Sequence, residues 1–558
     1  MTSRRPAGAR EGLKSMEKLR EGSIRRLTVE GYAADGAGVG RLEGVVAFVT
    51  GGVRGEACDV LLEKVGRSAC WGRVVRVAEP SPARVEPDCP YAGVCGGCQF
   101  RHVTYAEELE AKRQRVEEAL RRIGGAELSV PVILGAKQTE RYRNKVQFPV
   151  SGGAKGVRAG FYRRRTHQVV DVADCLLQPQ AAARLRAAAK GWMERWGVPA
   201  YDERTGRGLV RHFYVRVNRR GESLFCLLVN GKGVPREGEL VEALRAAEPG
   251  LTGVVLGVNE RKNNVILGES YRTLWGTDRL EDTLCGMTFR LSVPSFYQVN
   301  ADQAEVLYGQ ALDFAALAGE ETVLDLYCGI GTISLALARR AGRVIGAEVV
   351  PQAVDDAREN AVRNGVKNAE FLCADAGEAA ARLEAEGVRP DVVCVDPPRK
   401  GLSPDVVETI ARMAPRRVVY VSCDPGTLAR DVKRFGELGY AAQKAVAVDL
   451  FPRTAHVETV VLLSKLNTKQ HIEVDLNLDE LDLTAAESKA TYDEIKAYVL
   501  EKHGLKVSSL YISQVKRKCG IIERDNYNKP KSEDAKQPQC PPEKEAAIME
   551  ALRYFYMV

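Results

Sequence analysis

The chain has 558 residues, 45% hydrophobic and 28% charged, with a formal net charge of +7 at pH 7, which is typical of a soluble globular protein of roughly two to four domains. No stretch approaches the ~18 consecutive apolar residues of a membrane span, and the basic N-terminus lacks the apolar segment of a secretory signal, so we expect a cytoplasmic protein. The mild positive charge permits a nucleic-acid partner without requiring one, and 14 cysteines without a secretion signal argue against a disulfide scaffold.

The first predicted domain is a small β-barrel. Residues 1–21 are expected to be a disordered leader. Residues 22–86 contain short alternating runs, such as "SIRRLTVEGYA" and "EACDVLLEKV", separated by glycine-rich turns, which predicts a barrel of about five strands. Basic residues such as Arg25 and Lys64 are scattered through it. They fit an oligonucleotide-binding barrel and a merely solvated surface about equally.

The second segment, residues 87–300, mixes helix and strand patterns and opens with a cysteine cluster. Cys89, Cys95 and Cys98 have the spacing C-x5-C-x2-C, and Cys175 in "VADCLLQP" is the best-placed fourth thiol. An amphipathic helix, "YAEELEAKRQRVEEALRRI", and strand-like runs such as "RYRNKVQFPV" follow the cluster. By spacing alone, four thiolates suit zinc or an iron–sulfur cluster about equally.

The third segment, residues 301–465, alternates short apolar runs with helical stretches. The runs are "ETVLDLY", "RVIGAEV", "AEFLCADA", "DVVCVDPP" and "RRVVYVS". This alternation predicts a Rossmann-like α/β domain with a parallel, doubly wound sheet. Two longer runs at its end, "AAQKAVAVDLF" and "HVETVVLLSK", have no helix between them. They predict an antiparallel hairpin on the edge of the sheet.

The last segment, residues 466–558, changes character. It contains "EVDLNLDELDL", a helical run near residues 485–503, the basic patch "QVKRKCG" and the Pro/Lys-rich "NKPKSEDAKQPQCPPEK". We predict a small appended domain, and the sequence does not indicate its function. The fold class is therefore multidomain: a small barrel, an α+β central domain, an α/β domain and a C-terminal appendage.

The first strand–turn–helix of the α/β segment has the features of a cofactor pocket. In "VLDLYCGIGTISLALA", Gly329 and Gly331 let the backbone approach a ligand at a helix N-terminus. Glu348 ends the next strand, where a carboxylate can hold ribose hydroxyls, and Asp375 follows the third, placed to accept from an adenine amino group. Ser334 replaces the third glycine of the dinucleotide pattern, so S-adenosylmethionine fits better than a pyrophosphate cofactor. The alternative is an α/β domain without a nucleotide.

The next two strands end in residues suited to covalent chemistry. "DPPRKG" is a rigid loop that presents Asp396, but Arg399 stands where amino-directed methyltransferases place an aromatic residue. Cys423 follows the next strand, and its thiolate could add to C6 of uracil and so activate C5 for methylation. Glu458 in "HVETV" could then remove the C5 proton. The structural alternatives are a packed thiol at a strand end and an exposed strand acid.

Several of these motifs occur together in one known family. "DPPRKG", "VSCDPGTLARD" and "HVETV" appear in order in a chain that resembles the RNA uracil-5 methyltransferases over residues 22–465. These enzymes make 5-methyluridine in 23S ribosomal RNA or in transfer RNA. The resemblance implies that Cys423 is the nucleophile and Glu458 the proton acceptor. It also implies that Phe296 stacks near the target base and that Arg143 lines the base pocket. The implied contacts to the methyl donor are Gln298, Tyr327, Thr332, Glu348, Asp375 and Asp396.

The resemblance extends to the N-terminal half of the chain. Family members with this cysteine pattern carry a 4Fe–4S cluster, which implies that Cys89, Cys95, Cys98 and Cys175 are its ligands. The barrel resembles the TRAM domain, a small RNA-binding module. Together these features favour 23S ribosomal RNA as the substrate of a monomeric enzyme, with the T-loop uridine of transfer RNA as the second candidate. A non-catalytic RNA-binding iron–sulfur protein is a third, which the intact nucleophile and base disfavour.

Overall fold

The structure, a computed structural model, describes residues 19–153, 156–466, 492–519 and 540–554. It divides into two compact units, Met1–Asn467 and Thr468–Val558. The predicted leader lies outside the described residues except at 19–21. There Leu19 is buried against the core of the barrel that follows.

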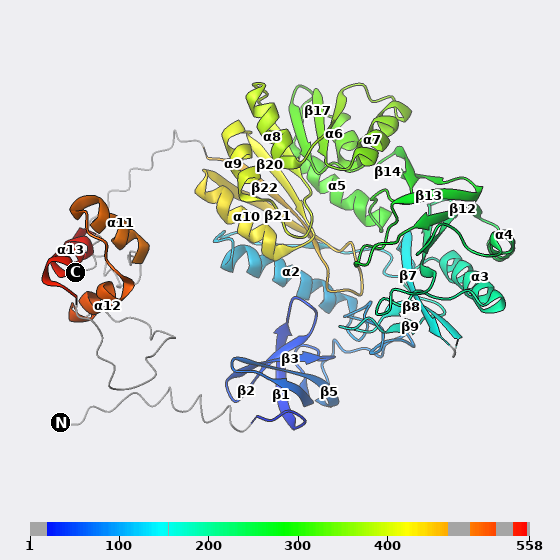
Figure 1. Cartoon of the computed structure of the whole chain (residues 1–558), viewed down its shortest axis with the longest axis horizontal. Helices are drawn as coiled ribbons and strands as arrows, with labels where there is room; N and C mark the ends of the chain where they lie inside the picture. Colours follow the sequence, from blue (N-terminus) through cyan, green and yellow to red (C-terminus); the bar gives the residue numbers. More distant parts are fainter. Residues whose placement is uncertain (1–18, 154–155, 467–491, 520–539, 555–558) are drawn as a thin grey trace. The chain divides into compact units, whose positions relative to one another are not determined.

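The N-terminal part of the first unit is a closed barrel of strands in the order β1-β2-β3-β5-β4 (Figure 1). Side chains alternate between the inside and the outside of the barrel, as on β1, where Leu27 and Val29 are buried and Thr28 and Glu30 are exposed. The predicted small barrel is therefore confirmed. The strands are β1 (Ile24–Tyr32), β2 (Gly38–Leu42), β3 (Val45–Thr50), β4 (Ala57–Val65) and β5 (Ala69–Glu79).

The central part is a mixed sheet in the order β13-β12-β11-β10-β7-β8-β9. Strands β10 and β11 are buried along their whole length because they lie inside the sheet, and helices α3 and α4 share an apolar core with its strands. A two-stranded hairpin, β14–β15, follows. The elements are β7 (Lys145–Gly153), β8 (Gly156–Tyr162), β9 (Val169–Asp171), α3 (Gln180–Trp196), β10 (Val210–Val217), β11 (Ser223–Val229), α4 (Glu237–Ala247), β12 (Leu251–Val258), β13 (Ser270–Gly276), β14 (Arg279–Leu284) and β15 (Met287–Ser292).

The third part is the predicted doubly wound α/β sheet, in the order β18-β17-β16-β19-β20-β22-β21-β6. Strands β16 to β20 run parallel to one another. The strands are β6 (Ile133–Leu134), β16 (Thr322–Leu326), β17 (Arg343–Glu348), β18 (Ala369–Cys373), β19 (Val392–Val395), β20 (Arg417–Ser422), β21 (Tyr440–Val448) and β22 (Glu458–Lys465).

Helices cover both faces of this sheet, because each face has an apolar core of its own. Helices α5, α6 and α7 contribute to one core, and α2, α8, α9 and α10 to the other. Adjacent residues of β16 divide between them, with Val323 in the first core and Leu324 in the second. The helices are α2 (Tyr105–Arg122), α5 (Ala301–Ala315), α6 (Thr332–Ala338), α7 (Pro351–Arg363), α8 (Ala376–Ala385), α9 (Pro404–Met413) and α10 (Pro425–Glu437).

The predicted hairpin at the end of the sheet is present, but its second strand is not an edge. β22 pairs antiparallel with both β20 and β21, so it lies inside the sheet. β6, from far earlier in the chain, then adds parallel to β21. The expectation that Glu458 starts an edge strand is therefore wrong, because the returning strand inserts between β20 and β21.

The second unit is a small helical domain. Its helices are α11 (Tyr492–His503), α12 (Ser509–Lys518) and α13 (Pro542–Tyr554), and they share an apolar core that includes Ile495, Ile512 and Ile548. Of the predicted helical run, the part from residue 492 is seen in α11, whereas "EVDLNLDELDL" lies outside the described residues. In the described part of the chain, none of the helices combines the length and the hydropathy needed to cross a membrane.

Candidate active site

Cys423 and Glu458 are brought together by the pairing of β20 with β22. Ser422, the last residue of β20, lies opposite Thr459 of β22. One further step in the same register places Cys423 opposite Glu458, and residues directly opposite each other in antiparallel strands point to the same face. The thiol and the carboxyl therefore face one crevice, at the carboxyl ends of the parallel strands, where open α/β sheets bind their ligands.

The residues after Cys423 explain why its thiol stands at a turn. Asp424 caps helix α10, since its carboxylate accepts from the N–H groups of Gly426 (2.9 Å) and Thr427 (3.0 Å). Pro425 follows at the first helical position, where a missing N–H costs nothing. Cys423 thus precedes a helix N-terminus, whose partial positive charge favours a thiolate.

The surroundings of Cys423 oppose its ionisation in the free protein. Burial first, and the carboxyls of Glu458 and Asp396 second, raise the pKa of the Cys423 thiol to about 11, while Arg399 opposes the shift. With that pKa, only about one molecule in ten thousand carries the thiolate at pH 7. A change in its electrostatic surroundings that lowers this pKa would therefore speed a reaction of Cys423 near pH 7.

Glu458 is not the exposed strand acid of the structural alternative, because only 4% of it is exposed. Burial raises the pKa of Glu458 to about 8, with Asp396 adding to the shift and Arg399 opposing it. Burial likewise raises the pKa of Asp396 to about 7. A carboxyl whose pKa lies near ambient pH can both accept and release a proton, as a general base must.

Arg399 and His456 are two residues of the crevice to which the sequence analysis gave no role. The Arg399 guanidinium lies 3.4 Å from both ring nitrogens of His456. Burial first, and the Arg399 charge second, lower the pKa of His456 to about 4, so the imidazole is neutral at pH 7. The place of Arg399 directly after the two prolines of "DPPRKG" was the signal that could have identified it.

The predicted donor pocket is built at the carboxyl ends of β16, β17 and β18. Tyr327 has a φ of 69° in the turn after β16. Glu348 ends β17 and accepts from the N–H of Gly329 (3.2 Å) in the same turn. Asp375 is exposed after β18 and caps α8 through the N–H of Gly377 (3.0 Å). The turn and two carboxylates therefore lie on successive strand ends, as the sequence pattern requires.

The remaining predicted donor contacts lie around this pocket. Thr332 begins helix α6, and its hydroxyl lies 3.2 Å from that of Tyr308. Asp396 follows β19, the strand on the other side of β16. Gln298 is 7% exposed in the segment before α5, and its main-chain carbonyl accepts a hydrogen bond from the side-chain amide of Asn144 (2.9 Å).

The two predicted base-pocket residues lie near cations and aromatic rings. Phe296 is 62% exposed, and Lys145 Nζ lies 5.9 Å from the centre of its ring. The Arg143 guanidinium lies 5.9 Å from the ring of Phe451, which in turn packs edge-on against His456. Arg143 is thereby linked through contacts to the crevice of Cys423, whereas most of Phe296 is exposed at the surface.

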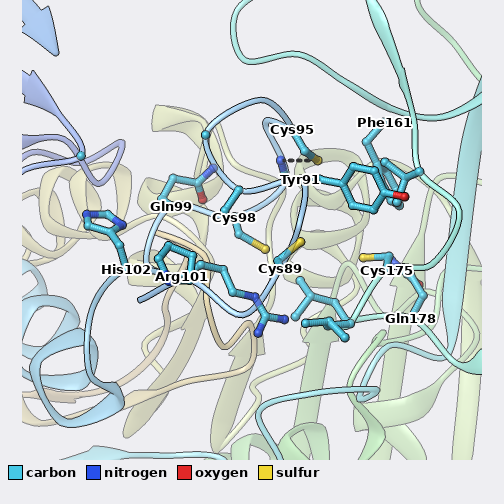
Figure 2. Close-up of a pocket in the computed structure, with 18 of the residues that line it drawn as sticks. Cys89, Tyr91, Cys95, Cys98, Gln99, Arg101, His102, Phe161, Cys175 and Gln178 are labelled. Atoms are coloured by element: carbon cyan, nitrogen blue, oxygen red, sulfur yellow. Dashed lines mark hydrogen bonds between the residues drawn. The ribbon is translucent and has the colours of Figure 1, made fainter. Parts of the chain in front are cut away.

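The four predicted cysteine ligands line one cavity of about 310 Å³ (Figure 2). Burial raises the pKa of the thiols of Cys95 and Cys175, and that of Cys98 to about 12. Apolar side chains and the three arginines Arg84, Arg101 and Arg143 also line the cavity. Among the described residues, no three His, Cys, Asp or Glu side chains are close enough together to hold a single metal ion.

The doubly wound sheet and the crevice at its strand ends are features of ligand-binding α/β folds, methyltransferases among them. The family model described as tRNA (Uracil-5-)-methyltransferase matches residues 253–466. An uncharacterized RNA methyltransferase of Clostridium tetani is 40% identical over 453 residues, which are 81% of this chain and 98% of the relative. One of Halalkalibacterium halodurans is 40% identical over 456 residues, 81% of this chain and 100% of the relative.

A solved structure agrees with these sequence relatives. It is the Pyrococcus abyssi tRNA (uracil-54, C5)-methyltransferase in complex with S-adenosyl-L-homocysteine, with a TM-score of 0.64 and 28% identity. The match covers 78% of this chain and 99% of that one. The chain belongs to the RNA uracil-5 methyltransferase family and is an RNA methyltransferase.

The geometry predicts how alkylation of Cys423 depends on pH. Because the pKa of Cys423 is raised to about 11, its reaction with iodoacetamide should accelerate about tenfold per pH unit from pH 7 to 10. Above pH 8 the ionised Glu458 opposes thiolate formation, so Glu458→Gln should speed alkylation at pH 9. The rate is measured by mass spectrometry of the peptide that contains Cys423.

The control is Glu437→Gln, an exposed carboxylate at the far end of helix α10. It should leave the alkylation rate unchanged. An equal rate for Glu458→Gln and the unsubstituted protein at pH 9 would show that the two side chains do not interact.

Proposed function

We propose that this protein transfers a methyl group from S-adenosylmethionine to C5 of a uridine in RNA. The observation that carries the proposal is the pairing of Ser422 with Thr459, which puts Cys423 and Glu458 at the same end of β20 and β22, beside Asp396. The pair combines a nucleophile with a base of suitable pKa in the crevice where this fold binds its ligands.

The residues of the crevice divide the reaction into steps. The Cys423 thiolate forms a bond to C6 of the uracil, and the electron pair moves toward C5 and O4. C5 then takes the methyl group. Glu458 accepts the C5 proton, the C5–C6 double bond re-forms, and the bond from C6 to sulfur breaks. Arg399 stabilises the thiolate at the start and at the end, since it opposes the raised pKa of Cys423.

The donor pocket fits S-adenosylmethionine by the chemistry of its residues. Glu348 and Asp375 offer carboxylate oxygens to ribose hydroxyls and an adenine amino group. When bound, the donor supplies an electrophilic methyl group on a positively charged sulfur. That charge would favour the ionised forms of Asp396 and Glu458, whose pKa values are raised in the free protein. The residues assigned to the donor are Gln298, Tyr327, Thr332, Glu348, Asp375 and Asp396.

The RNA must present its uridine outside a duplex, because C5 and C6 are reached only in an unstacked base. We assign Phe296 to stacking on this base, since its ring is exposed at the surface. Arg143 supplies positive charge for the adjoining backbone. Burial lowers the pKa of Lys145, beside the ring, to about 7, so its ammonium group is only partly charged at pH 7. The barrel of residues 22–86 is assigned to RNA binding outside the catalytic crevice.

The mechanism predicts a trapped covalent complex. RNA that contains 5-fluorouridine should remain bound to the protein in the presence of S-adenosylmethionine, because fluorine at C5 cannot leave as a proton. A denaturing gel detects the complex. Cys423→Ala should abolish it, whereas Cys540→Ala, in the second unit, should not. A complex that survives Cys423→Ala would contradict the proposed nucleophile.

The base is tested in the same assay with ordinary RNA. Glu458→Gln keeps addition and methyl transfer but slows release, so a covalent complex should accumulate that the unsubstituted enzyme does not show. Rapid release by Glu458→Gln would mean that another group removes the C5 proton.

We further propose that the four-cysteine cavity holds a 4Fe–4S cluster, a group that suits four cysteine thiolates. The cavity of about 310 Å³ surrounds a space rather than a single ion position. Arg101 and Arg143 line it and would offset the negative charge of thiolate ligands. In the proposal, the cluster orders the RNA-binding region. Its ligands are Cys89, Cys95, Cys98 and Cys175.

Protein purified without oxygen should contain about four iron atoms per chain and show a broad visible absorbance. Cys175→Ser should lower the iron content and weaken the absorbance. Cys540→Ser, outside the cavity, should change neither. Stoichiometric zinc in place of iron would overturn the assignment.

Two RNA substrates follow from different observations. The barrel and the four-cysteine cavity, through the family resemblance, favour 23S ribosomal RNA. The solved relative from Pyrococcus abyssi is a tRNA (uracil-54, C5)-methyltransferase, which favours the T-loop uridine. Mass mapping of 5-methyluridine in both RNAs, from cells that lack this protein, separates them by which RNA loses the modification.

A further inference from the structure

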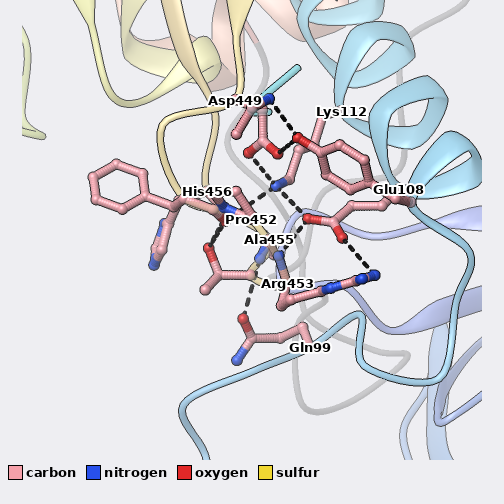
Figure 3. Close-up of polar contacts among 12 residues, drawn as sticks. Gln99, Glu108, Lys112, Asp449, Pro452, Arg453, Ala455 and His456 are labelled. Atoms are coloured by element: carbon pink, nitrogen blue, oxygen red, sulfur yellow. Dashed lines mark hydrogen bonds and ion pairs between the residues drawn. The ribbon is translucent and has the colours of Figure 1, made fainter. Parts of the chain in front are cut away.

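The loop of residues 449–457 joins β21 to β22 and leads directly into Glu458. It is held from two sides by segments of the central part of the chain. One is helix α2, and the other is the loop that carries Cys95 and Cys98 (Figure 3). The position of the catalytic base therefore depends on contacts made far away in the sequence.

Helix α2 holds the start of this loop through a buried ion network. Lys112 is 1% exposed, and its Nζ donates to Oε1 of Glu108 and Oδ1 of Asp449, at 2.7 Å each, and to the carbonyl of Phe451 at 3.2 Å. The backbone N–H of Arg453 donates to the same Glu108 oxygen at 2.7 Å. A buried network of this kind is favourable only when all its partners are in place, so it allows the loop little freedom.

Gln99 holds the end of the loop. Its backbone N–H donates to the carbonyl of Arg453 at 3.0 Å. Its side-chain Oε1 accepts from the N–H of Ala455 at 3.1 Å, while its Nε2 donates to the carbonyl of Gly96 at 3.0 Å. Gly96 lies between Cys95 and Cys98 in the chain. The Gln99 side-chain amide therefore connects the cysteine loop to the 449–457 loop that leads into Glu458.

Two further contacts leave Gln99 and Ala455 little room to move. A turn of the barrel closes over them: a Cβ atom on Gly36 would lie 2.8 Å from the Cβ of Gln99 and 3.4 Å from that of Ala455. On the other side, Arg115 of helix α2 donates to the carbonyl of Ala455 at 2.8 Å. Both backbone polar groups of Ala455 are thus bound, three residues before Glu458.

We propose that Gln99 is a positioning residue for the catalytic base: it holds Ala455 so that the chain enters β22 with the Glu458 carboxyl directed at the target base. The inference rests on the proposed function, in which Glu458 removes the C5 proton. Val457, the residue between the held loop and Glu458, is fully buried, so a displacement at Ala455 is passed on along the backbone.

The test variant is Gln99→Met, which keeps the side-chain length but removes both hydrogen bonds of the amide. Addition and methyl transfer do not use Glu458, so trapping on 5-fluorouridine RNA should proceed at the unsubstituted rate. Release of methylated ordinary RNA should slow on the order of tenfold, with accumulation of the covalent complex, because a small misplacement of a base is costly. The KM for S-adenosylmethionine should not change.

Two other variants control for effects on folding and on helix α2. Gln114→Met removes a glutamine of α2 that bonds Arg54 and Glu110 instead of the loop, at 2.6 Å each, and should release product normally. Gln99→Glu keeps an acceptor for the Ala455 N–H and should release product faster than Gln99→Met.

Three outcomes would overturn the role of Gln99. They are normal release by Gln99→Met, loss of fluorouridine trapping by Gln99→Met, and equal defects in Gln99→Met and Gln99→Glu. The second outcome would mean that Gln99 is needed for folding or for the addition of Cys423 to the target base. If the unsubstituted protein itself forms no trapped complex, the proposed function fails, and that result is distinct from all three.

Discussion

The antiparallel insertion of β22 beside β20 is the constraint on which the rest of the site depends. A strand that returned parallel to β20 would put its first residue at the amino ends of the parallel strands, whereas Cys423 lies at their carboxyl ends. Because β22 runs antiparallel to β20, Ser422 at the end of β20 pairs with Thr459 near the start of β22. The next residue after Ser422 is Cys423, and the residue before Thr459 is Glu458, so the two lie at the same end of the strand pair. The positions of the proposed nucleophile, Cys423, and of the proposed base, Glu458, are therefore set by the main-chain pairing of β20 with β22, which holds them more rigidly than loops would.

Burial of acidic groups gives the crevice its chemistry. Two carboxyls, those of Asp396 and Glu458, have pKa values raised to about 7 and about 8, in each case first by burial. Arg399 is the cation that lowers the pKa of both the Cys423 thiol and the Glu458 carboxyl. Carboxyls with pKa values near 7 to 8 ionise more readily when a positive charge is added nearby, and a sulfonium donor carries such a charge. Binding of the donor and activation of the site are thus physically connected.

The N-terminal half of the chain contributes to the site through the loop before β22. Lys112 from helix α2 and Gln99 from the cysteine loop hold opposite ends of this loop, and the barrel turn at Gly36 packs over Gln99. The contacts of Lys112 and Gln99 with the loop join parts of the chain that are more than 300 residues apart in sequence. They provide a physical reason why a cysteine cavity and an active site occur in one protein.

The sequence by itself determined the barrel, the doubly wound sheet and the candidate residues, because strand and helix periods, glycine turns and the motifs around Cys423 and Glu458 are local patterns. Tertiary structure alone decided that β22 is an inner strand, that β6 completes the sheet, and that Glu458 is buried with a raised pKa. It also decided the partnership of Gln99 with Ala455. Burial, strand order and long-range hydrogen bonds depend on which distant segments meet, and no local pattern of residues encodes that.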